Sequence, residues 1–319
     1  MTYSTETIFG SQQRLGSLRD NGDVVDLRAT YERFLQADGD SQAAAIAAVR
    51  IPDTMIGFIL GADRSVAAAD AALSFASPVI VAAANVCLEA PLVPGKMICM
   101  GRNYWEHAAE STMPVPDDFP RGFVKVSSTL TRPYADIAYP WPTKQFDFEA
   151  ELVVVIGKRA NGVRKEEAMD YVFGYTVMND LSARDWQFAE RAKGNHLLGK
   201  NLDATGPMGP AIVLRRDLPD PANLRVSTRV NGKTRQDGYT RQMIHDIPTM
   251  IAHWSRMTLE PGDIISTGTP EGVAAGGSAG AKYLQAGDVL ETEVQGVGLL
   301  RNRIVAASRE VEGTYGNPR

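Results

Sequence analysis

The sequence predicts an α+β protein in which strands dominate, preceded by a small α/β unit. From about residue 90 onward, short runs rich in Val, Ile and Leu recur with few helical segments between them. This spacing argues against the regular strand–helix alternation of a doubly wound fold. Before residue 85, by contrast, Ala-rich segments typical of helices predominate.

Composition is that of an ordinary globular protein. Of the 319 residues, 22% are charged and 44% are hydrophobic, and the formal net charge is -5. Lys and Arg form no cluster, which argues against nucleic acid or anionic membrane as a partner. No apolar run approaches the roughly 20 residues of a transmembrane helix, and no secretory signal is visible. With only two cysteines, Cys87 and Cys99, the chain is expected to be cytoplasmic and free of disulfides.

The first unit is predicted to cover residues 1–88. The segment "GDVVDLRATYERFL" indicates a short strand and then a helix from about Ala29. Two further helices are indicated by "DSQAAAIAAVR" and "DRSVAAADAALSF". The run "LEAPLVPGKMICMGRNY" then breaks the chain with two prolines and a glycine, so a second domain is placed at residues 89–319.

The second domain is predicted to consist mainly of strands. The Asn-Gly pair in "RVNGKTRQ" indicates a hairpin, and "VQGVGLLRNRI" suggests another. Helices are expected at Lys165–Tyr171, Ala183–Ala192 and Ile247–Trp254, with Ser182 as the N-cap of the second. The strands are expected at Lys96–Met100, Phe123–Val126, Glu151–Ile156, Phe173–Asn179, Ala211–Leu214, Arg225–Val230, Asp263–Ser266, Val289–Val294 and Gly298–Val305.

Three acids at alternate positions lead into a buried-looking strand in "DFEAELVVVIG". Residues i, i+2 and i+4 of a strand share one face, so Asp147, Glu149 and Glu151 would repel one another there. One interpretation is a solvated strand edge that discourages aggregation. The other is a divalent cation, since hard ions such as Mg²⁺ take carboxylate oxygens as ligands. Asp180 ends a later strand and could complete such a site.

Other polar residues have weaker individual signals. Arg184 and Gln187 are three apart on a predicted helix and could bind a substrate carboxylate, although a helix-surface Arg is usually solvated. In "GRNYWEHAAE", His107 and Glu110 have the spacing that lets a carboxylate orient an imidazole for base catalysis. Such pairs are also common by chance. Lys200 lies in a loop before a strand, where most lysines face solvent.

Five motifs in this order resemble the landmarks of the fumarylacetoacetate hydrolase family: "GRNYWEHAAE", "DFEAELVVVIG", "YTVMNDLSARDWQ", "GKNLDATGPMGP" and "STGTPEGV". The resemblance runs from about Leu92 to Ile304, and the first 85 residues resemble the variable leading domain of longer members. It implies a mixed β-sheet roll around a divalent metal, usually Mg²⁺ and sometimes Mn²⁺ or Ca²⁺. Such proteins are usually homodimers.

The resemblance also implies roles for individual residues. Glu149, Glu151 and Asp180 match the metal ligands, and His107 with Glu110 matches the water-activating pair on a mobile lid. Lys200 matches the lysine near the reacting carbonyl. The positions that match substrate-binding residues are Lys125, Arg184, Gln187 and either Thr267 or Thr269.

The implied reaction is hydrolysis of a C–C bond in a 2,4-dioxoacid of the acylpyruvate or fumarylpyruvate type, through a metal-bound enolate. His107, steadied by Glu110, would activate water, and Lys200 would stabilise the oxyanion. The same enolate arises when oxaloacetate is decarboxylated or a hydroxymuconate-type diacid is isomerised, so an isomerase or decarboxylase is the alternative. In a third reading the protein only binds, its metal stabilises the fold, and the His107 pair and Lys200 are dispensable.

Overall fold

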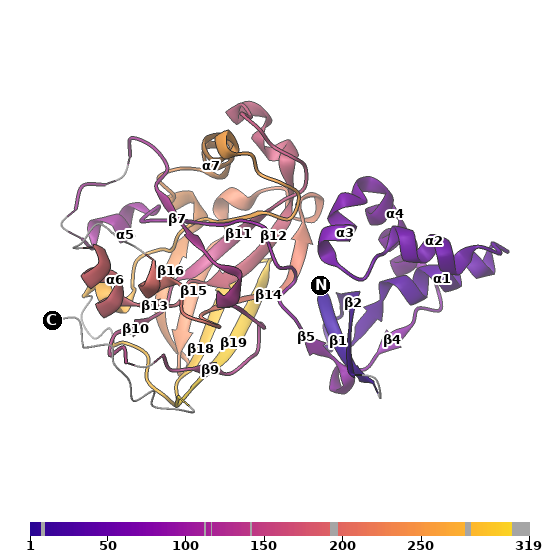
Figure 1. The fold of residues 1–319 in the computed structure, drawn as a ribbon, viewed down its shortest axis with the longest axis horizontal. Coiled ribbons are helices and arrows are strands. Elements are labelled where there is room, and N and C mark those ends of the chain that lie inside the picture. Colours follow the sequence, from indigo (N-terminus) through magenta and orange to yellow (C-terminus); the bar gives the residue numbers. More distant parts are fainter. Residues whose placement is uncertain are drawn as a thin grey trace.

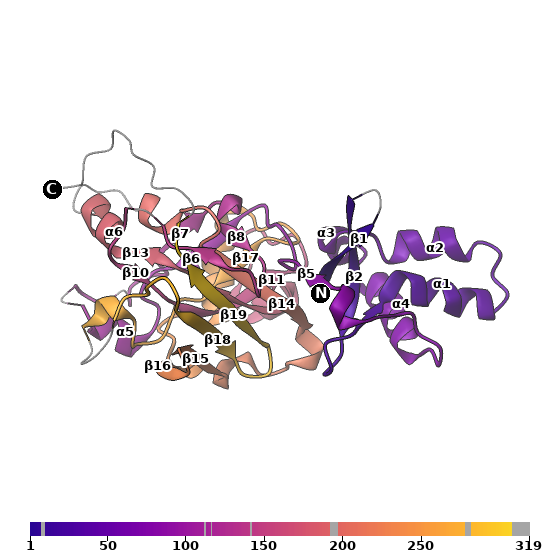
Figure 2. The same ribbon diagram turned by 90° about the horizontal axis from the view of Figure 1, so that it is seen from below.

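The chain folds into two units of unequal size, a small N-terminal one that contains β1 to β5 and a larger β-rich one that follows it (Figures 1 and 2). This computed structural model describes residues 1–7, 10–111, 113–115, 117–140, 142–191, 197–277 and 282–307. None of the helices in these ranges has both the length and the apolarity needed to cross a membrane. The predicted fold class, β-rich α+β, is confirmed.

The N-terminal unit is an antiparallel sheet with four helices. The sheet has the order β4-β3-β2-β1-β5, and its strands are β1 (Thr2–Thr7), β2 (Gly10–Leu18), β3 (Val24–Asp26), β4 (Ile80–Val81) and β5 (Cys87–Leu88). The helices are α1 (Leu27–Ala37), α2 (Ala43–Arg50), α3 (Met55–Leu60) and α4 (Ala62–Ser74). The Asp26 side chain accepts a hydrogen bond from Ala29 N at 2.8 Å, so α1 begins two residues before the predicted Ala29. The predicted strand and three helices are present, whereas the β1–β2 hairpin and α3 were not predicted.

A mixed seven-stranded sheet forms the centre of the larger unit, in the order β7-β6-β17-β11-β12-β14-β8. The pairs β6–β17 and β8–β14 are parallel, and the remaining neighbours are antiparallel. Its strands are β6 (Met97–Met100), β7 (Gly122–Lys125), β8 (Leu130–Thr131), β11 (Ala150–Ile156), β12 (Val172–Asn179), β14 (Gly206–Leu214) and β17 (Ile264–Ser266).

A five-stranded sheet of order β16-β15-β18-β19-β9 packs beside it. Both predicted hairpins are confirmed: β15 pairs with β16, and β18 pairs with β19. Asn231 and Gly232 have φ values of +52° and +74°, which is why the first turn requires this residue pair. The strands are β9 (Ile137–Ala138), β15 (Arg225–Val230), β16 (Lys233–Tyr239), β18 (Val289–Val294) and β19 (Gly298–Val305); a separate pair consists of β10 (Phe146–Asp147) and β13 (Ser182–Ala183).

Within the described residues, the α-helices of the larger unit are α5 (Trp105–Ala109), α6 (Arg184–Arg191) and α7 (Ile247–Trp254). The predicted helix at Lys165–Tyr171 is a 3₁₀ helix. The prediction of Ser182 as an N-cap is wrong, because Ser182 belongs to β13 and its hydroxyl donates to Asp180 O at 2.8 Å. The short β10–β13 pairing therefore delays the start of α6 to Arg184.

Strand β11 separates two apolar cores. Leu152 and Val154 pack with α7 residues on one face, whereas Val153 and Val155 face helices of the N-terminal unit. The two units share this second core, so the N-terminal unit covers one face of the central sheet. The proposed domain division at residues 88 and 89 stays a prediction. Glu151, two residues before Val153, lies on the same face as Val153.

Candidate active site

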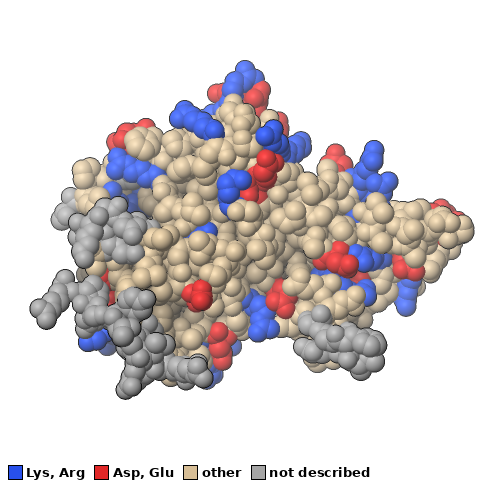
Figure 3. All heavy atoms as spheres, in the orientation of Figure 1, with Lys and Arg blue, Asp and Glu red and all other residues tan. Residues whose placement is uncertain are grey.

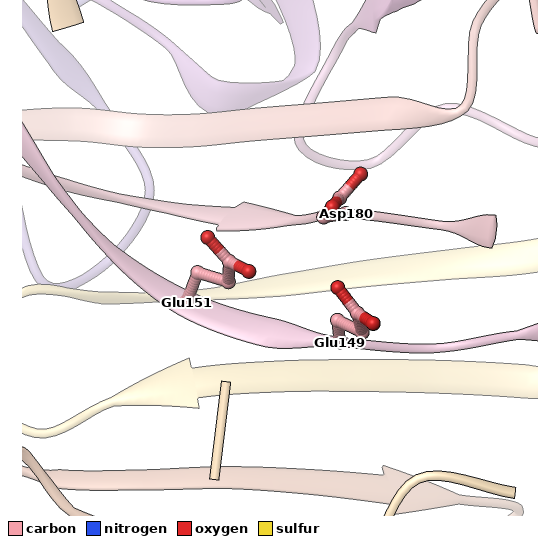
Figure 4. Close-up of side chains that lie close together, drawn as sticks. All are labelled: Glu149, Glu151 and Asp180. Atoms are coloured by element: carbon pink, nitrogen blue, oxygen red, sulfur yellow. The ribbon is translucent and has the colours of Figure 1, made fainter. Parts of the chain in front are cut away.

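Three buried carboxylates meet at the ends of two neighbouring strands. Glu149 precedes β11, Glu151 lies within it, and Asp180 follows β12. The antiparallel register pairs Ala150 with Asn179, and Asp180 N donates to Glu149 O at 2.9 Å. One oxygen of each carboxylate lies within 4.8 Å of the other two, and the three side chains lie close together (Figure 4). The three residues are 0–6% exposed, which rules out the solvated strand edge.

Basic side chains surround one side of this cluster. Lys200 Nζ donates to Glu149 Oε2 at 2.6 Å and to Asp180 Oδ2 at 2.7 Å. Lys125 Nζ lies behind Asp180, donating to its Oδ1 at 2.7 Å and to Lys200 O. Burial by itself would raise the pKa of Glu149, but the charges of Lys200 and Arg184 outweigh it and hold that pKa well below its usual range. Glu149 is therefore ionised.

Hydroxyl and backbone groups surround the other side. Glu151 Oε2 accepts hydrogen bonds from Ser266 Oγ and, at 3.2 Å, from Gly268 N. Its Oε1 is buried without a hydrogen-bond partner. Burial, followed by the charges of Asp180 and Glu149, raises the pKa of Glu151 well above its ordinary value. The protonated form of this carboxyl is therefore favoured without a cation, and a cation would favour the ionised form.

The donor set fits a hard divalent cation. All the ligand atoms are carboxylate oxygens, which such ions prefer, and a buried oxygen without a partner is costly unless something binds it. Crowding three acids in a buried site is also unfavourable unless positive charge compensates them. The three residues thus form an acidic site of the kind that binds divalent cations.

Asp147, the first of the alternating acids, lies apart from this cluster. Its Oδ2 accepts from Arg184 Nε at 2.8 Å, and its Oδ1 accepts from Ala274 N at 2.8 Å. The strand is interrupted between β10 and β11, so the regular alternation ends at residue 148. The idea that three acids of this stretch share one site therefore holds for only two of them.

Arg184 and Gln187 share a face of α6, as their spacing predicted. Arg184 Nη1 donates to Gln187 Oε1 at 2.9 Å. Nη2 forms an ion pair with Glu149 Oε1 at 2.7 Å. A guanidinium has five N–H groups, and the contacts with Asp147, Gln187 and Glu149 use three of them, so Nη1 and Nη2 each keep one that a ligand carboxylate could use.

His107 and Glu110 form the predicted pair. His107 Nδ1 lies 2.8 Å from Glu110 Oε2, and Glu110 Oε1 accepts from Gly272 N at 2.8 Å. The carboxylate thus binds one ring nitrogen of His107 and is itself anchored to the loop after β17. This arrangement leaves Nε2 as the ring nitrogen that can exchange a proton with a ligand.

A pocket of about 320 Å³ is lined by the His107–Glu110 pair, by Arg184 and Lys200 and, of the three clustered carboxylates, by Glu149. Its wall includes Thr269 but, among the described residues, neither Thr267 nor Lys125. Thr267 is fully buried beside Tyr104, so of the two threonines only Thr269 can touch a ligand in the pocket. The polar lining residues are Arg102, His107, Glu110, Ser111, Arg121, Glu149, Arg184, Gln187, Lys200 and Thr269.

Several residues at the site were not predicted. Ser266 binds Glu151, and Gln236 Nε2 donates to Thr269 Oγ1 at 2.8 Å while its Oε1 accepts from Ala150 N at 3.0 Å. Ser266 could have been suspected because it ends a predicted strand just before the Thr267 turn. Gln236 lies in the other sheet, and no local pattern in the sequence distinguishes it.

Sequence similarity to known proteins extends over most of the chain. The profile of a family described as "Fumarylacetoacetate (FAA) hydrolase C-terminal" matches residues 96–305. Oxaloacetate tautomerase fahd2, a mitochondrial protein of Xenopus laevis, is 38% identical over 295 residues, covering 92% of this chain and 86% of that protein. Oxaloacetate tautomerase YisK of Bacillus subtilis is 36% identical over 318 residues, covering 95% of this chain and 100% of that protein.

A solved structure shares both the fold and the length of the chain. Maleylpyruvate hydrolase from Sphingobium sp. SYK-6, in complex with manganese(II) ion and pyruvate, has a TM-score of 0.71 and 30% identity. The alignment covers 97% of this chain and 100% of that one.

Proposed function

Because this chain belongs to the fumarylacetoacetate hydrolase family, we propose that it enolises a 2-oxo dicarboxylic acid, interconverting keto and enol forms of an oxaloacetate-type substrate. The oxaloacetate tautomerases of X. laevis and B. subtilis support this choice over C–C hydrolysis. The observation that carries the proposal is a His–Glu pair that lines the same pocket as Glu149, one of the three carboxylates of the buried cluster.

His107 is the proton-transfer group in this proposal. Tautomerisation needs a base that removes a proton from the carbon beside the 2-carbonyl and delivers it to the carbonyl oxygen, and in the reverse direction moves it back to the carbon. Glu110 binds Nδ1 at 2.8 Å, so Nε2 is the atom that takes and returns this proton. Because Glu110 is anchored on Gly272 N, the imidazole is held in one orientation during both steps.

The remaining polar groups bind and stabilise the acid. Arg184 and Gln187 are placed to bind the carboxylate beside the 2-carbonyl, with Arg184 Nη1 and Nη2 each supplying one N–H group. Lys200 carries positive charge because Asp180 and Glu149 outweigh the effect of burial and raise its pKa. That ammonium would stabilise negative charge on the enolate oxygen. A cation bound by Glu149, Glu151 and Asp180, which we propose to be Mg²⁺, would supply Lewis-acid polarisation of the carbonyl.

Ultraviolet absorbance of the enol provides the test. Purified protein with Mg²⁺ is expected to speed the approach of oxaloacetate to keto–enol equilibrium, in proportion to enzyme concentration. His107→Ala should lower this rate by about 100-fold or more, since general base catalysis contributes 10²–10⁴-fold. His253→Ala is the matched control because His253 stacks on Phe119 and is not one of the residues that line the pocket. Equal rates for the wild type and His107→Ala would contradict the proposal.

Hydrolysis of an acylpyruvate is the second candidate. A pocket of about 320 Å³ lies in the range that holds larger ligands, so a four-carbon acid would leave room for an acyl group and a water molecule. The two reactions differ in their products, because hydrolysis releases pyruvate and a second acid. Incorporation of ¹⁸O from solvent into a carboxylate product would favour hydrolysis, and its absence while the enol decays would favour tautomerisation.

We also propose that the protein is a homodimer, as the resemblance to the family implies. Strand β7 is an edge of the central sheet, and Val124 and Val126 are 51% and 44% exposed there. Size-exclusion chromatography with light scattering tests this, and a mass near 34.6 kDa would contradict it.

A further inference from the structure

Asp147 has four hydrogen-bond donors around one buried carboxylate. Oδ1 accepts from Phe148 N at 2.9 Å and from Ala274 N at 2.8 Å. Oδ2 accepts from Arg184 Nε at 2.8 Å and from Ala275 N at 3.0 Å. The residue is 0% exposed, so no water competes for these donors. An amide could not replace the carboxylate here, because its NH₂ group would face donors only.

The segment whose backbone donates to Asp147 also donates to Glu110. The 3₁₀ helix Ala274–Gly276 supplies two of the Asp147 donors. Two residues earlier, Gly272 N donates to Glu110 Oε1. Gly276 packs against the same carboxylate so closely that a Cβ there would lie 2.5–2.7 Å from it. Residues 272–276 thus form the segment that binds the Glu110 carboxylate, which we call the seat of Glu110.

Arg184 is the other group that Asp147 fixes. Its Nε is bound by Asp147, its Nη1 by Gln187 and its Nη2 is paired with Glu149. Asp147 also compensates part of the guanidinium charge, which would otherwise face Glu149 alone. A planar guanidinium held at Nε has a defined orientation, so its outer donors point in a fixed direction.

We propose that Asp147 is a positioning residue that couples the orientation of Arg184 to the seat of Glu110, and hence to His107. This inference rests on the proposed function, in which Arg184 binds the substrate carboxylate and His107 transfers the proton. One buried carboxylate would then set both ends of the substrate site, although it touches neither the substrate nor a cation.

The first test is a double-mutant cycle on ligand binding. Oxalate, a non-reacting analogue, is titrated by calorimetry into Mn²⁺-loaded wild type, Asp147→Asn, Arg184→Gln and the double variant. Asp147→Asn is expected to weaken oxalate binding by about 10- to 100-fold, the usual cost of losing a supporting group. The double variant should bind oxalate with about the affinity of the single variant that binds it less tightly, because both substitutions remove the same contact.

Asp185→Asn is the matched control. Asp185 precedes Trp186 on the same helix and accepts from Thr143 Oγ1 and Lys144 N, without contacting Arg184 in the hydrogen bonds described. Its effect on oxalate binding should be small and should add to that of Arg184→Gln. If Asp147→Asn and Arg184→Gln also add independently, the coupling to Arg184 is absent and the proposal is overturned.

The second test follows the seat of Glu110 without any ligand or turnover. Hydrogen–deuterium exchange of helix α5, Trp105–Ala109, is measured in wild type, Asp147→Asn and Arg184→Gln. Amides of α5 should exchange faster in both variants than in wild type and Asp185→Asn, because each substitution removes the hydrogen bond between Asp147 and Arg184. If Asp147→Asn does not fold, Arg184→Gln alone decides, and unchanged exchange in α5 overturns the coupling.

These readouts separate the inference from the proposed function. Absence of tautomerase activity in the wild type would refute the proposed reaction while leaving the exchange result interpretable. Normal activity with unchanged α5 exchange in the variants would instead refute the role of Asp147 alone.

Discussion

The carboxylate cluster has two sides that differ in chemistry, although Glu149 on one side and Glu151 on the other are only two residues apart in the sequence. The cationic side, made of Lys125, Arg184 and Lys200, surrounds Glu149 and Asp180. The hydroxyl side, made of Ser266 and the backbone of Gly268, offers Glu151 only neutral donors. The pKa of Glu149 is held low and that of Glu151 is raised as a result.

This difference assigns separate tasks to two identical side chains. Glu149 is held in its ionised form by Lys200 and Arg184, whereas we expect Glu151 to become ionised only when a cation binds. A site with three permanently ionised acids would be strained without metal, and one with three neutral acids would bind metal weakly. We therefore expect one acid that gives up its proton to let the site fold without a cation and bind it afterwards.

Removing the charge of Glu149 tests the cationic side. In chelator, Glu149→Gln should lower the free energy of unfolding by about 3–5 kcal/mol, since it leaves Lys200 and Arg184 buried with one partner fewer. Urea denaturation measures this. Asp70→Asn is the control, because Asp70 pairs with Arg216 at an exposed site where a pair is worth about 1 kcal/mol or less. A loss no larger than that of the control would contradict the contrast between the two sides.

The same substitution at Glu151 should affect cation affinity much more than the free energy of unfolding. Glu151→Gln mimics the protonated acid, so we expect the free energy of unfolding in chelator to change by about 1 kcal/mol or less. Cation affinity should nevertheless fall by about 100-fold, as the site loses a charged ligand. Calorimetric titration with Mn²⁺ and urea denaturation measure the two quantities. A stability loss equal to that of Glu149→Gln would show that the sides are equivalent.

The raised pKa of Glu151 predicts a pH dependence of known sign. The folded protein without cation keeps this proton, so its stability contribution is present below the ordinary pKa of Glu and is lost as the pH rises through the folded value. Cation binding needs the ionised form, so affinity should rise with pH, by up to about tenfold per unit below that pKa. Mn²⁺ titrations between about pH 5.5 and 8 measure this. In Glu151→Gln the Mn²⁺ affinity should depend less on pH. A wild-type Mn²⁺ affinity that falls as the pH rises would contradict this prediction.

The smallest expected effect is on the hydroxyl side itself. Ser266→Ala removes the hydroxyl donor to Glu151, which costs about 1.5 kcal/mol when the acceptor is ionised, so Mn²⁺ affinity should fall about tenfold. Ser227→Ala serves as the comparison, because Ser227 is also a buried strand serine but lies on β15 in the other sheet. Identical Mn²⁺ affinities in the two variants would show that Ser266 does not tune Glu151.

Much of this arrangement could be predicted from the sequence because it is local. The Asn-Gly turn, the strand after Glu149 and the spacing of His107 and Glu110 each depend on neighbouring residues. The family order of the motifs added the fold, and Asp180 was recognised because it follows a strand end.

What escaped prediction depends on pairing between distant segments. The β1–β2 hairpin is polar and lacks a clear alternation of apolar residues, so its register comes from tertiary context. Ser182 was expected to cap a helix because its local pattern favours that, but pairing with Asp147 kept it in a strand. The contrast between Glu149 and Glu151 comes from Lys200 and Ser266, which lie about 50 and 115 residues further along the chain.

The most direct test of the metal site is a Mn²⁺ titration followed by the electron paramagnetic resonance signal of the free ion. The wild type is expected to remove one Mn²⁺ per chain from solution, with Mg²⁺ as a competitor, and Glu149→Gln and Glu151→Gln should each bind Mn²⁺ about 100-fold more weakly. Binding of wild-type affinity in both variants, or none in the wild type, would contradict the assignment of Glu149, Glu151 and Asp180 as the cation ligands.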